Sequence, residues 1–206
     1  AVVGGTYTTW GSSFPKSLNA WVDYNSFSSE IMGYLFESLV TLHPTKNEPV
    51  GVLAQKWEIS EDKKSFTFTI HPKATWSDGV PITASDIQYY YDVMMDTKNK
   101  TSLFRVSLSR FERPTIVSEK VVKVTAKEVH WNNFWDAAGL TAFPKHVWEG
   151  KNFNKLNFDF PVVSGPYIIK EIKKNRYLTL KRRDYWWGRV KQFNLNKYNF
   201  SELKYR

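Results

Sequence analysis

The chain has 206 residues, enough for one domain or two small ones, and its aromatic content of 17% excludes general disorder. It contains no cysteine, which excludes disulfide scaffolds, thiolate zinc sites and cysteine nucleophiles. The net charge of +9 favours encounter with anionic partners, although the basic residues are scattered along the sequence.

Membrane and export signals are absent from the sequence itself. No apolar run approaches the roughly 20 residues that span a bilayer. The first residues, Ala1-Val2-Val3, lack the basic and apolar regions of a signal peptide. An export signal cleaved before this start remains compatible with the sequence.

The first predicted elements are a strand, a loop and a helix. Residues Thr6 to Trp10 are rich in β-formers and predict a strand. Residues 11 to 26 are polar and turn-rich, which is typical of a surface loop that carries function. Apolar residues at helical spacing then predict a helix from Ser28, as its cap, to Val40.

A strand with one buried face is predicted next. After a turn at Asp62-Lys63-Lys64, Phe66, Phe68 and Ile70 alternate with threonines. This period of two places the apolar side chains on one face of the strand and the threonines on the other.

The stretch ATWSDGVPITASDIQYYYDVM, residues 74 to 94, predicts a turn that leads into a capped helix. Asp78-Gly79 supplies residue types that tolerate positive φ in a tight turn. Thr83 can cap the helix while Asp86 answers from the first turn, a capping-box variant. Apolar residues at helical spacing continue the helix over 84–96. We interpret this stretch as scaffold.

The rest of the chain predicts further strands around an aromatic-rich segment. Residues 116 to 129 alternate in polarity, which predicts a strand or a hairpin arm. Residues 130 to 148 are rich in aromatics, and strand-like segments follow at 168–169 and 177–181. The densest basic cluster alternates with these strand-like residues and is interpreted as a solvated sheet face or turn. It consists of Lys170, Lys173, Lys174, Arg176, Lys181, Arg182 and Arg183.

Several motifs, in order, resemble those of the extracellular solute-binding proteins of family 5, the peptide- and oligopeptide-binding components of ABC importers. Residues 76–86 match W-S-D-G-x-P-x-T-A-x-D, and GYLFESLV contains L-F-E-x-L. A third pattern is matched by Pro49, Leu53, Ala54, Trp57, Ser60, Asp62, Phe66, Phe68 and Ile70. Residues 162–167 resemble the x-G-S-G-P-Y return strand, with Val163 in place of a glycine, and the tail NKYNFSELKYR is similar to a peptide-binding subgroup.

The resemblance implies an α/β fold in which a mixed sheet with helices forms a periplasmic-binding-protein-like first lobe. Residues 1–42 would form the first segment of this lobe, 43–160 an inserted α+β subdomain, and 161–206 the return segment. Family members are longer and have a second lobe that this chain lacks. We therefore expect a fragment that retains half of a binding cleft and binds weakly, because one-sided burial gains less desolvation.

The resemblance also implies a function, which is peptide capture outside the cytoplasmic membrane, in the periplasm or at the cell surface. The expected partners are a peptide ligand and the membrane permease of an ABC importer, and no cofactor or metal is implied. Relatives also carry nickel complexes and oligosaccharides, so a non-peptide solute is an alternative. The oligomeric state does not follow from the sequence.

Candidate ligand-binding residues follow from the same resemblance. In relatives, the loop after the first strand pairs with the peptide through its main chain, and here that loop contains Tyr24, Asn25 and Ser26. Ser164-Gly165, where the chain returns to the first lobe, are the next candidates because glycine allows a close approach of ligand to backbone. Phe104 is a further candidate, although a core aromatic is the favoured interpretation.

An enzyme is the first alternative from a different class, and the sequence argues against it. No H-E-x-x-H or other close metal spacing and no G-x-S-x-G elbow occurs. The four histidines, His43, His71, His130 and His146, lie far apart in sequence. We expect no enzymatic activity.

A binder of nucleic acid or of an envelope polymer is the second alternative, suggested by the charge of +9 and the nine tryptophans. Base-stacking aromatics must lie on an exposed basic face. Trp57, Trp76, Trp131 and Trp186 instead belong to motifs that look structural. We therefore expect no nucleic-acid partner.

Overall fold

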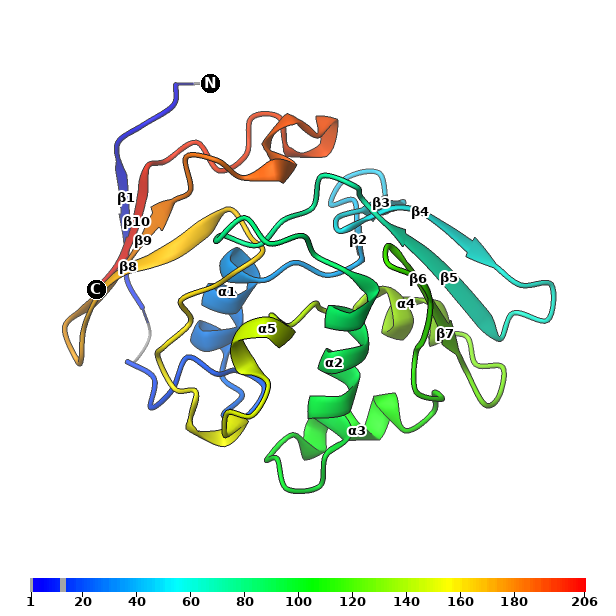
Figure 1. Ribbon diagram of the computed structural model, residues 1–206. Helices are drawn as coiled ribbons and strands as arrows, with labels where there is room; N and C mark the ends of the chain where they lie inside the picture. Colours follow the sequence, from blue (N-terminus) through cyan, green and yellow to red (C-terminus); the bar gives the residue numbers. More distant parts are fainter. Residues whose placement is uncertain (1, 12–13) are drawn as a thin grey trace.

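Two four-stranded sheets flank a group of helices in the fold of this chain (Figure 1). The computed structural model describes residues 2–11 and 14–206. Ala1, at the predicted start, and Ser12-Ser13, in the predicted loop, lie outside the described residues. The mixed α/β class predicted from the sequence is confirmed.

The first sheet joins the two ends of the chain. Its order is β1-β10-β9-β8, in which β1 and β10 are parallel and the other pairs are antiparallel. The strands are β1 (Thr6–Thr9), β8 (Tyr167–Lys173), β9 (Tyr177–Arg182) and β10 (Glu202–Tyr205). In Figure 1 the blue β1 lies beside the red β10. The predicted strand at the amino terminus is confirmed.

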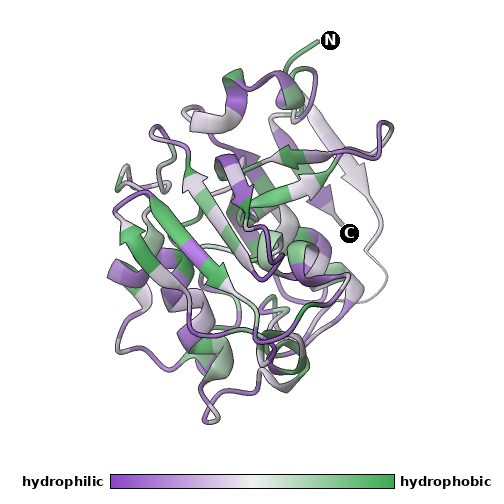
Figure 2. Cartoon of the chain, turned by 90° about the vertical axis from the view of Figure 1, so that its right-hand side faces the viewer, coloured by the Kyte–Doolittle hydropathy of each residue, from purple (hydrophilic) through white to green (hydrophobic). Residues whose placement is uncertain are grey.

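The second sheet is antiparallel, in the order β4-β5-β7-β6. Its strands are β4 (Ala54–Ile59), β5 (Ser65–Ile70), β6 (Thr115–Ser118) and β7 (Val121–Thr125), and a separate hairpin joins β2 (Val40–Leu42) to β3 (Pro49–Gly51). Phe66, Phe68 and Ile70 are buried as their alternation predicted. Apolar and polar residues alternate along the strands in Figure 2. The strand or hairpin arm predicted over 116–129 is a hairpin of β6 and β7, which ends at Thr125.

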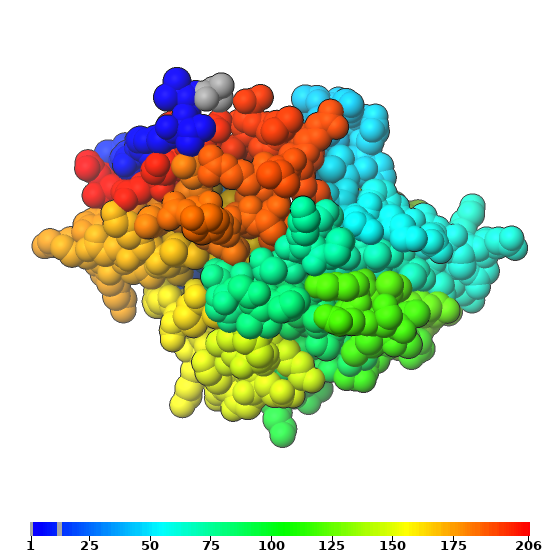
Figure 3. Space-filling model, turned by 45° about the horizontal axis from the view of Figure 1, so that its top comes forward, coloured from blue at the N-terminus to red at the C-terminus, as the bar shows by residue number. Residues whose placement is uncertain are grey.

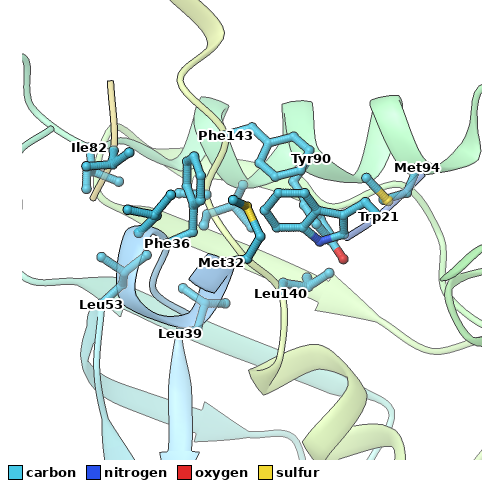
Figure 4. Close-up of a cluster of buried hydrophobic side chains, with 14 of the residues drawn as sticks. Trp21, Met32, Phe36, Leu39, Leu53, Ile82, Tyr90, Met94, Leu140 and Phe143 are labelled. Carbon is cyan, nitrogen blue, oxygen red and sulfur yellow. The ribbon is translucent and has the colours of Figure 1, made fainter. Parts of the chain in front are cut away.

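Helices occupy the space between the two sheets. They are α1 (Ser26–Leu35), α2 (Ala84–Met95), α3 (Ser102–Leu108), α4 (Asn133–Ala138) and α5 (Lys145–Trp148), with short 3-10 turns η1 (Phe153–Lys155), η2 (Trp187–Val190) and η3 (Gln192–Asn194). Phe143 lies in the core, where its ring is 4.8 Å, between centroids, from each of the rings of Trp21 and Tyr90 (Figure 4). The Trp148 ring lies at the same distance from Phe143. None of the helices in the described ranges combines the length and apolar character needed to cross a bilayer.

The helix predicted from Ser28 to Val40 has different ends in the structure. Asn25 is the cap, because its side chain accepts a hydrogen bond from the Ser28 amide at 2.8 Å. The helix ends at Leu35, whose carbonyl accepts a hydrogen bond from the Gly165 amide at 2.8 Å. Phe36 is extended and leads towards β2. The apolar pattern of the sequence continues past Leu35, but the helix ends there, where its carbonyl pairs with Gly165, a residue distant in sequence.

The stretch 74–94 is the structural junction that its motif predicted. The Thr83 amide donates to Asp86 Oδ2 at 2.9 Å, and the Lys145 amide donates to Asp86 Oδ1 at 3.2 Å. Asp78 Oδ2 lies 2.8 Å from His146 Nε2. Asp86 therefore caps α2 and holds the start of α5, and Asp78 contacts the same α5 through His146.

The predicted division into three segments can be compared with the two sheets. The first sheet draws its strands from residues 1–42 and 161–206, whereas the second lies wholly within 43–160. The β2–β3 hairpin spans the boundary at residue 42. The division itself stays a prediction.

Candidate functional site

A cleft of about 450 Å³ lies between α1 and the segment from Trp186 to Tyr198. One wall comes from the loop before α1 and from α1 itself, including Trp21 and Met32. The opposite wall carries Trp186, Phe193 and Tyr198 from the segment after β9. In Figure 3 the orange segment after β9 lies between the blue amino-terminal strand and the cyan β2–β4 region. Aromatic side chains therefore face the cleft from parts of the chain far apart in sequence.

Two of the six predicted ligand-binding residues line this cleft. Tyr24 is 64% exposed at its rim, and Phe104 contributes from α3 while packing partly against the core. Asn25 and Ser26 are outside the lining because they form the start of α1, where the Asn25 side chain serves as the cap. The structure thus brings Tyr24 and Phe104 to one cavity.

Ser164 and Gly165 lie behind the cleft wall. Ser164 is fully buried, and its Oγ accepts a hydrogen bond from the Glu37 amide at 2.9 Å. A Cβ added to Gly165 would lie 2.4 Å from the Tyr34 carbonyl oxygen, so the glycine allows close packing against the end of α1. Pro166, the next residue, does line the cleft. A ligand role for Ser164 and Gly165 stays a prediction.

Glu37 is a cleft residue that the sequence interpretation missed. Its side chain is in the lining although the residue is only 6% exposed. Oε2 accepts hydrogen bonds from the indole nitrogens of Trp187 at 3.3 Å and Trp186 at 3.5 Å. Burial raises the pKa of Glu37 to about 7, and these bonds oppose the rise only in part. The sequence signal is a lone carboxylate inside the apolar run YLFESLV.

Lys191 is a partly buried cation whose charge acts on this acid. Its Nζ donates to the Gly51 and Val52 carbonyl oxygens, both at 2.6 Å. Burial lowers the pKa of Lys191, and the Glu37 charge opposes this. The two hydrogen bonds attach the segment of η2 and η3 to the β3–β4 connection.

Arg183 corrects the interpretation of the basic cluster as wholly solvated. The residue is 8% exposed, and its guanidinium donates to the carbonyl oxygens of Ser164 at 2.9 Å, Gly165 at 3.0 Å and Trp76 at 3.1 Å. Lys170, Lys173, Lys174, Arg176 and Lys181 are exposed, as predicted. The buried guanidinium of Arg183 is stabilised by carbonyls of two segments that lie outside the sheets.

Trp131 is exposed, although its motif predicts a structural role. It is 85% exposed and lies next to α4, so the prediction is wrong for this tryptophan. Trp76 is fully buried and Trp186 nearly so, as expected. Within residues 2–11 and 14–206, no three His, Asp or Glu side chains are grouped so as to hold a metal ion.

Comparison with known proteins identifies similar sequences and folds. Residues 48–205 match the family described as bacterial extracellular solute-binding proteins, family 5 Middle. The oligopeptide-binding protein OppA of Bacillus subtilis is 28% identical over 197 residues, which cover 86% of this chain and 35% of OppA.

Two solved structures share the fold. The oligopeptide-binding protein AppA of Bacillus subtilis, in complex with a nonapeptide, superimposes with a TM-score of 0.83 at 20% identity, over 99% of this chain and 40% of AppA. A mannohexaose-bound oligopeptide-binding protein of Thermotoga maritima gives a TM-score of 0.80 at 20% identity, over 98% of this chain and 37% of that protein. The chain spans about 26% to 35% of the length of the curated relatives it matches.

Proposed function

Because the chain belongs to the bacterial extracellular solute-binding proteins of family 5, we propose that it takes part in peptide capture outside the cytoplasmic membrane. OppA, which is similar over 86% of this chain, is an oligopeptide-binding protein. The expected partner is the membrane permease of an ABC importer. Members of this family bind solutes, so the proposal includes no catalytic step.

The cleft carries this proposal. Its volume of about 450 Å³ suits a small ligand. Tyr24 and Tyr198 line it with rings that each carry a hydroxyl, and the largely buried Trp21 and Trp186 add apolar lining. Aromatic rings contact an apolar ligand surface without requiring one particular side chain. Such a surface supports the capture of peptides of varied sequence.

The described residues enclose a ligand from one side. The cleft lies between α1 and the segment after β9, and both belong to the part of the chain that matches about 40% of AppA. A ligand buried on one side gains less desolvation than one enclosed on both. We therefore propose weak binding by the 206-residue chain and tighter binding by a longer form that closes over the ligand.

Isothermal titration calorimetry with mixtures of short peptides tests this function. The expected result is saturable heat with peptides of several unrelated sequences, stronger in a longer form of the protein. Saturable binding of an oligosaccharide or of a nickel–histidine complex, with no heat from any peptide, would reject the peptide assignment.

A non-peptide solute is the second candidate, because the fold itself does not select a ligand. AppA was solved with a nonapeptide and the Thermotoga maritima protein with mannohexaose, yet both superimpose on nearly the whole of this chain. The same titrations with mannohexaose and with the nickel complex decide between the two candidates.

A further inference from the structure

The net charge of the protein is concentrated in one segment. Residues 161–206 contain 12 Lys and Arg but only 3 Asp and Glu, whereas residues 1–160 contain 17 of each kind. The return segment thus carries the whole charge of +9. The basic residues of 1–160 are balanced in number by acidic residues, whereas those of 161–206 are not.

Part of this charge surrounds a second cavity beside the cleft. The cavity has a volume of about 190 Å³ and is lined by Arg182, Arg183, Arg189 and Lys197, with no Asp or Glu in its lining. It shares Trp186 and Lys197, among other residues, with the cleft. The cavity and the cleft are therefore neighbours, separated by side chains that line both.

The basic side chains of this cavity differ in how many of their donors already have a hydrogen-bond partner. Arg183 uses its donors on carbonyl oxygens of the scaffold. Arg182 binds the Tyr198 and Asn199 carbonyls through Nη1, at 3.2 Å and 2.6 Å, and within the described residues neither its Nε nor its Nη2 donates a hydrogen bond. Nε is enclosed by the protein, whereas Nη2 is not, so Nη2 is the donor that a ligand acceptor can reach.

Lys197 stands between the two cavities. Its Nζ lies 3.2 Å from the centre of the Phe193 ring, and it makes no ion pair with any acid of the described chain. The residues on either side, Asn196 and Tyr198, both have positive φ, of 64° and 54°. Lys197 is thus held between two residues in the left-handed region, which side chains such as tyrosine rarely adopt.

We propose that this cavity is an anion subsite that receives a carboxylate of the ligand held in the cleft. The inference rests on the proposed function and adds a ligand class, acidic peptides. A planar carboxylate matches the donors of a guanidinium, and Arg182 has donors free to bind it. Arg189 and Lys197 supply further positive charge, so a peptide with an acidic side chain or a free carboxyl terminus binds better than its neutral counterpart.

The first test uses inorganic phosphate as a probe and does not depend on peptide binding. The Nε–H resonance of Arg182 is followed by NMR during titration with phosphate, with sodium chloride at equal ionic strength as reference. The expected result is a saturable shift with phosphate only, weakened about tenfold in Lys197→Gln. Lys174→Gln removes the same charge from the exposed β8–β9 turn and leaves the phosphate affinity unchanged. No saturable shift, or equal weakening in both variants, overturns the subsite.

The second test compares peptide pairs that differ only in Glu against Gln, or in a free against an amidated carboxyl terminus. We expect the acidic member to bind about tenfold more tightly, and this preference to shrink in Lys197→Gln but not in Lys174→Gln. Equal affinities within each pair overturn the carboxylate assignment while leaving peptide capture intact. If no peptide binds but phosphate still saturates, the proposed function fails and the anion cavity stands.

Discussion

The Ser164 hydroxyl accepts a hydrogen bond from the Glu37 amide at 2.9 Å, between residues 127 positions apart in sequence. This bond connects the segment that follows α1 to the segment that leads into β8. Both residues are buried, and Glu37 also faces the cleft. The bond thus ties the wall of the cleft, at Glu37, to the segment through which the chain returns to the first sheet.

Substituting Ser164→Ala should destabilise the fold, because the buried Glu37 amide loses its acceptor. We expect a loss of about 1–3 kcal/mol in the free energy of unfolding, measured by urea denaturation. Ser29→Ala is the matched control, since the buried Ser29 hydroxyl has no hydrogen-bond partner among the residues that the structure describes. Equal losses in the two variants would contradict a role for the bond.

Glu37 should make stability depend on pH. Its pKa is raised from 4.5 to about 7 in the folded state, so the folded protein retains a proton that the unfolded chain has lost between these values. Stability from this group is therefore present below pH 4.5 and falls as the pH rises to about 7, by about 3 kcal/mol in total.

Urea unfolding at a series of pH values checks this dependence. In Glu37→Gln the fall between pH 4.5 and 7 should become smaller by that amount, because the neutral amide does not titrate. The exposed Glu61→Gln is the control and should retain the wild-type profile. Identical profiles for wild type and Glu37→Gln would refute the assignment.

Gly165 and Gly33 should respond in opposite directions to alanine. A Cβ on Gly165 would lie 2.4 Å from a backbone oxygen of α1, and we expect Gly165→Ala to cost about 1–3 kcal/mol. Gly33 lies within α1, and an added Cβ would meet no atom of the other described residues within 4 Å beyond the local helix backbone, so Gly33→Ala should stabilise by about 0.5–1 kcal/mol. Thermal unfolding of both variants measures the contrast, and a stable Gly165→Ala protein would show that the packing relaxes.

Asp86 should contribute more to the free energy of unfolding than Asp92, a partly exposed acid on the same helix. It is buried and accepts from the amides of Thr83 and Lys145, so Asp86→Ala should cost about 2–4 kcal/mol. Asp92 pairs with Arg113 at the surface, and Asp92→Ala should cost less than about 1 kcal/mol. Similar costs for both substitutions would mean that the junction around Asp86 contributes little.

Tyr24 should contribute to ligand affinity. Tyr24→Ser removes an aromatic side chain at the cleft rim and should weaken peptide binding about tenfold, measured by calorimetry. Tyr185 is more exposed than Tyr24 and lies outside the cleft lining, so Tyr185→Ser should bind as the wild type does. Unchanged affinity in Tyr24→Ser would remove this residue from the site.

The elements that the sequence predicted well are those governed by near neighbours. Thr83 and Asp86 are three residues apart, so the start of α2 follows from local hydrogen bonding. The alternation in β5 follows from a period of two that any half-buried strand requires. The order of the family motifs likewise needs only the sequence, and it led to the correct fold class.

The tertiary structure decided the features that depend on partners distant in the chain. α1 ends at Leu35 because Gly165 pairs with it, and Arg183 is buried because its acceptors include the carbonyl of Trp76, 107 positions away. Glu37 becomes a cleft residue with a raised pKa only when Trp186 and Trp187 fold over it. The sequence by itself determined the local elements and the family, whereas the cleft and its charges were decided by long-range contacts, because a group's burial depends on the residues that cover it in the folded chain.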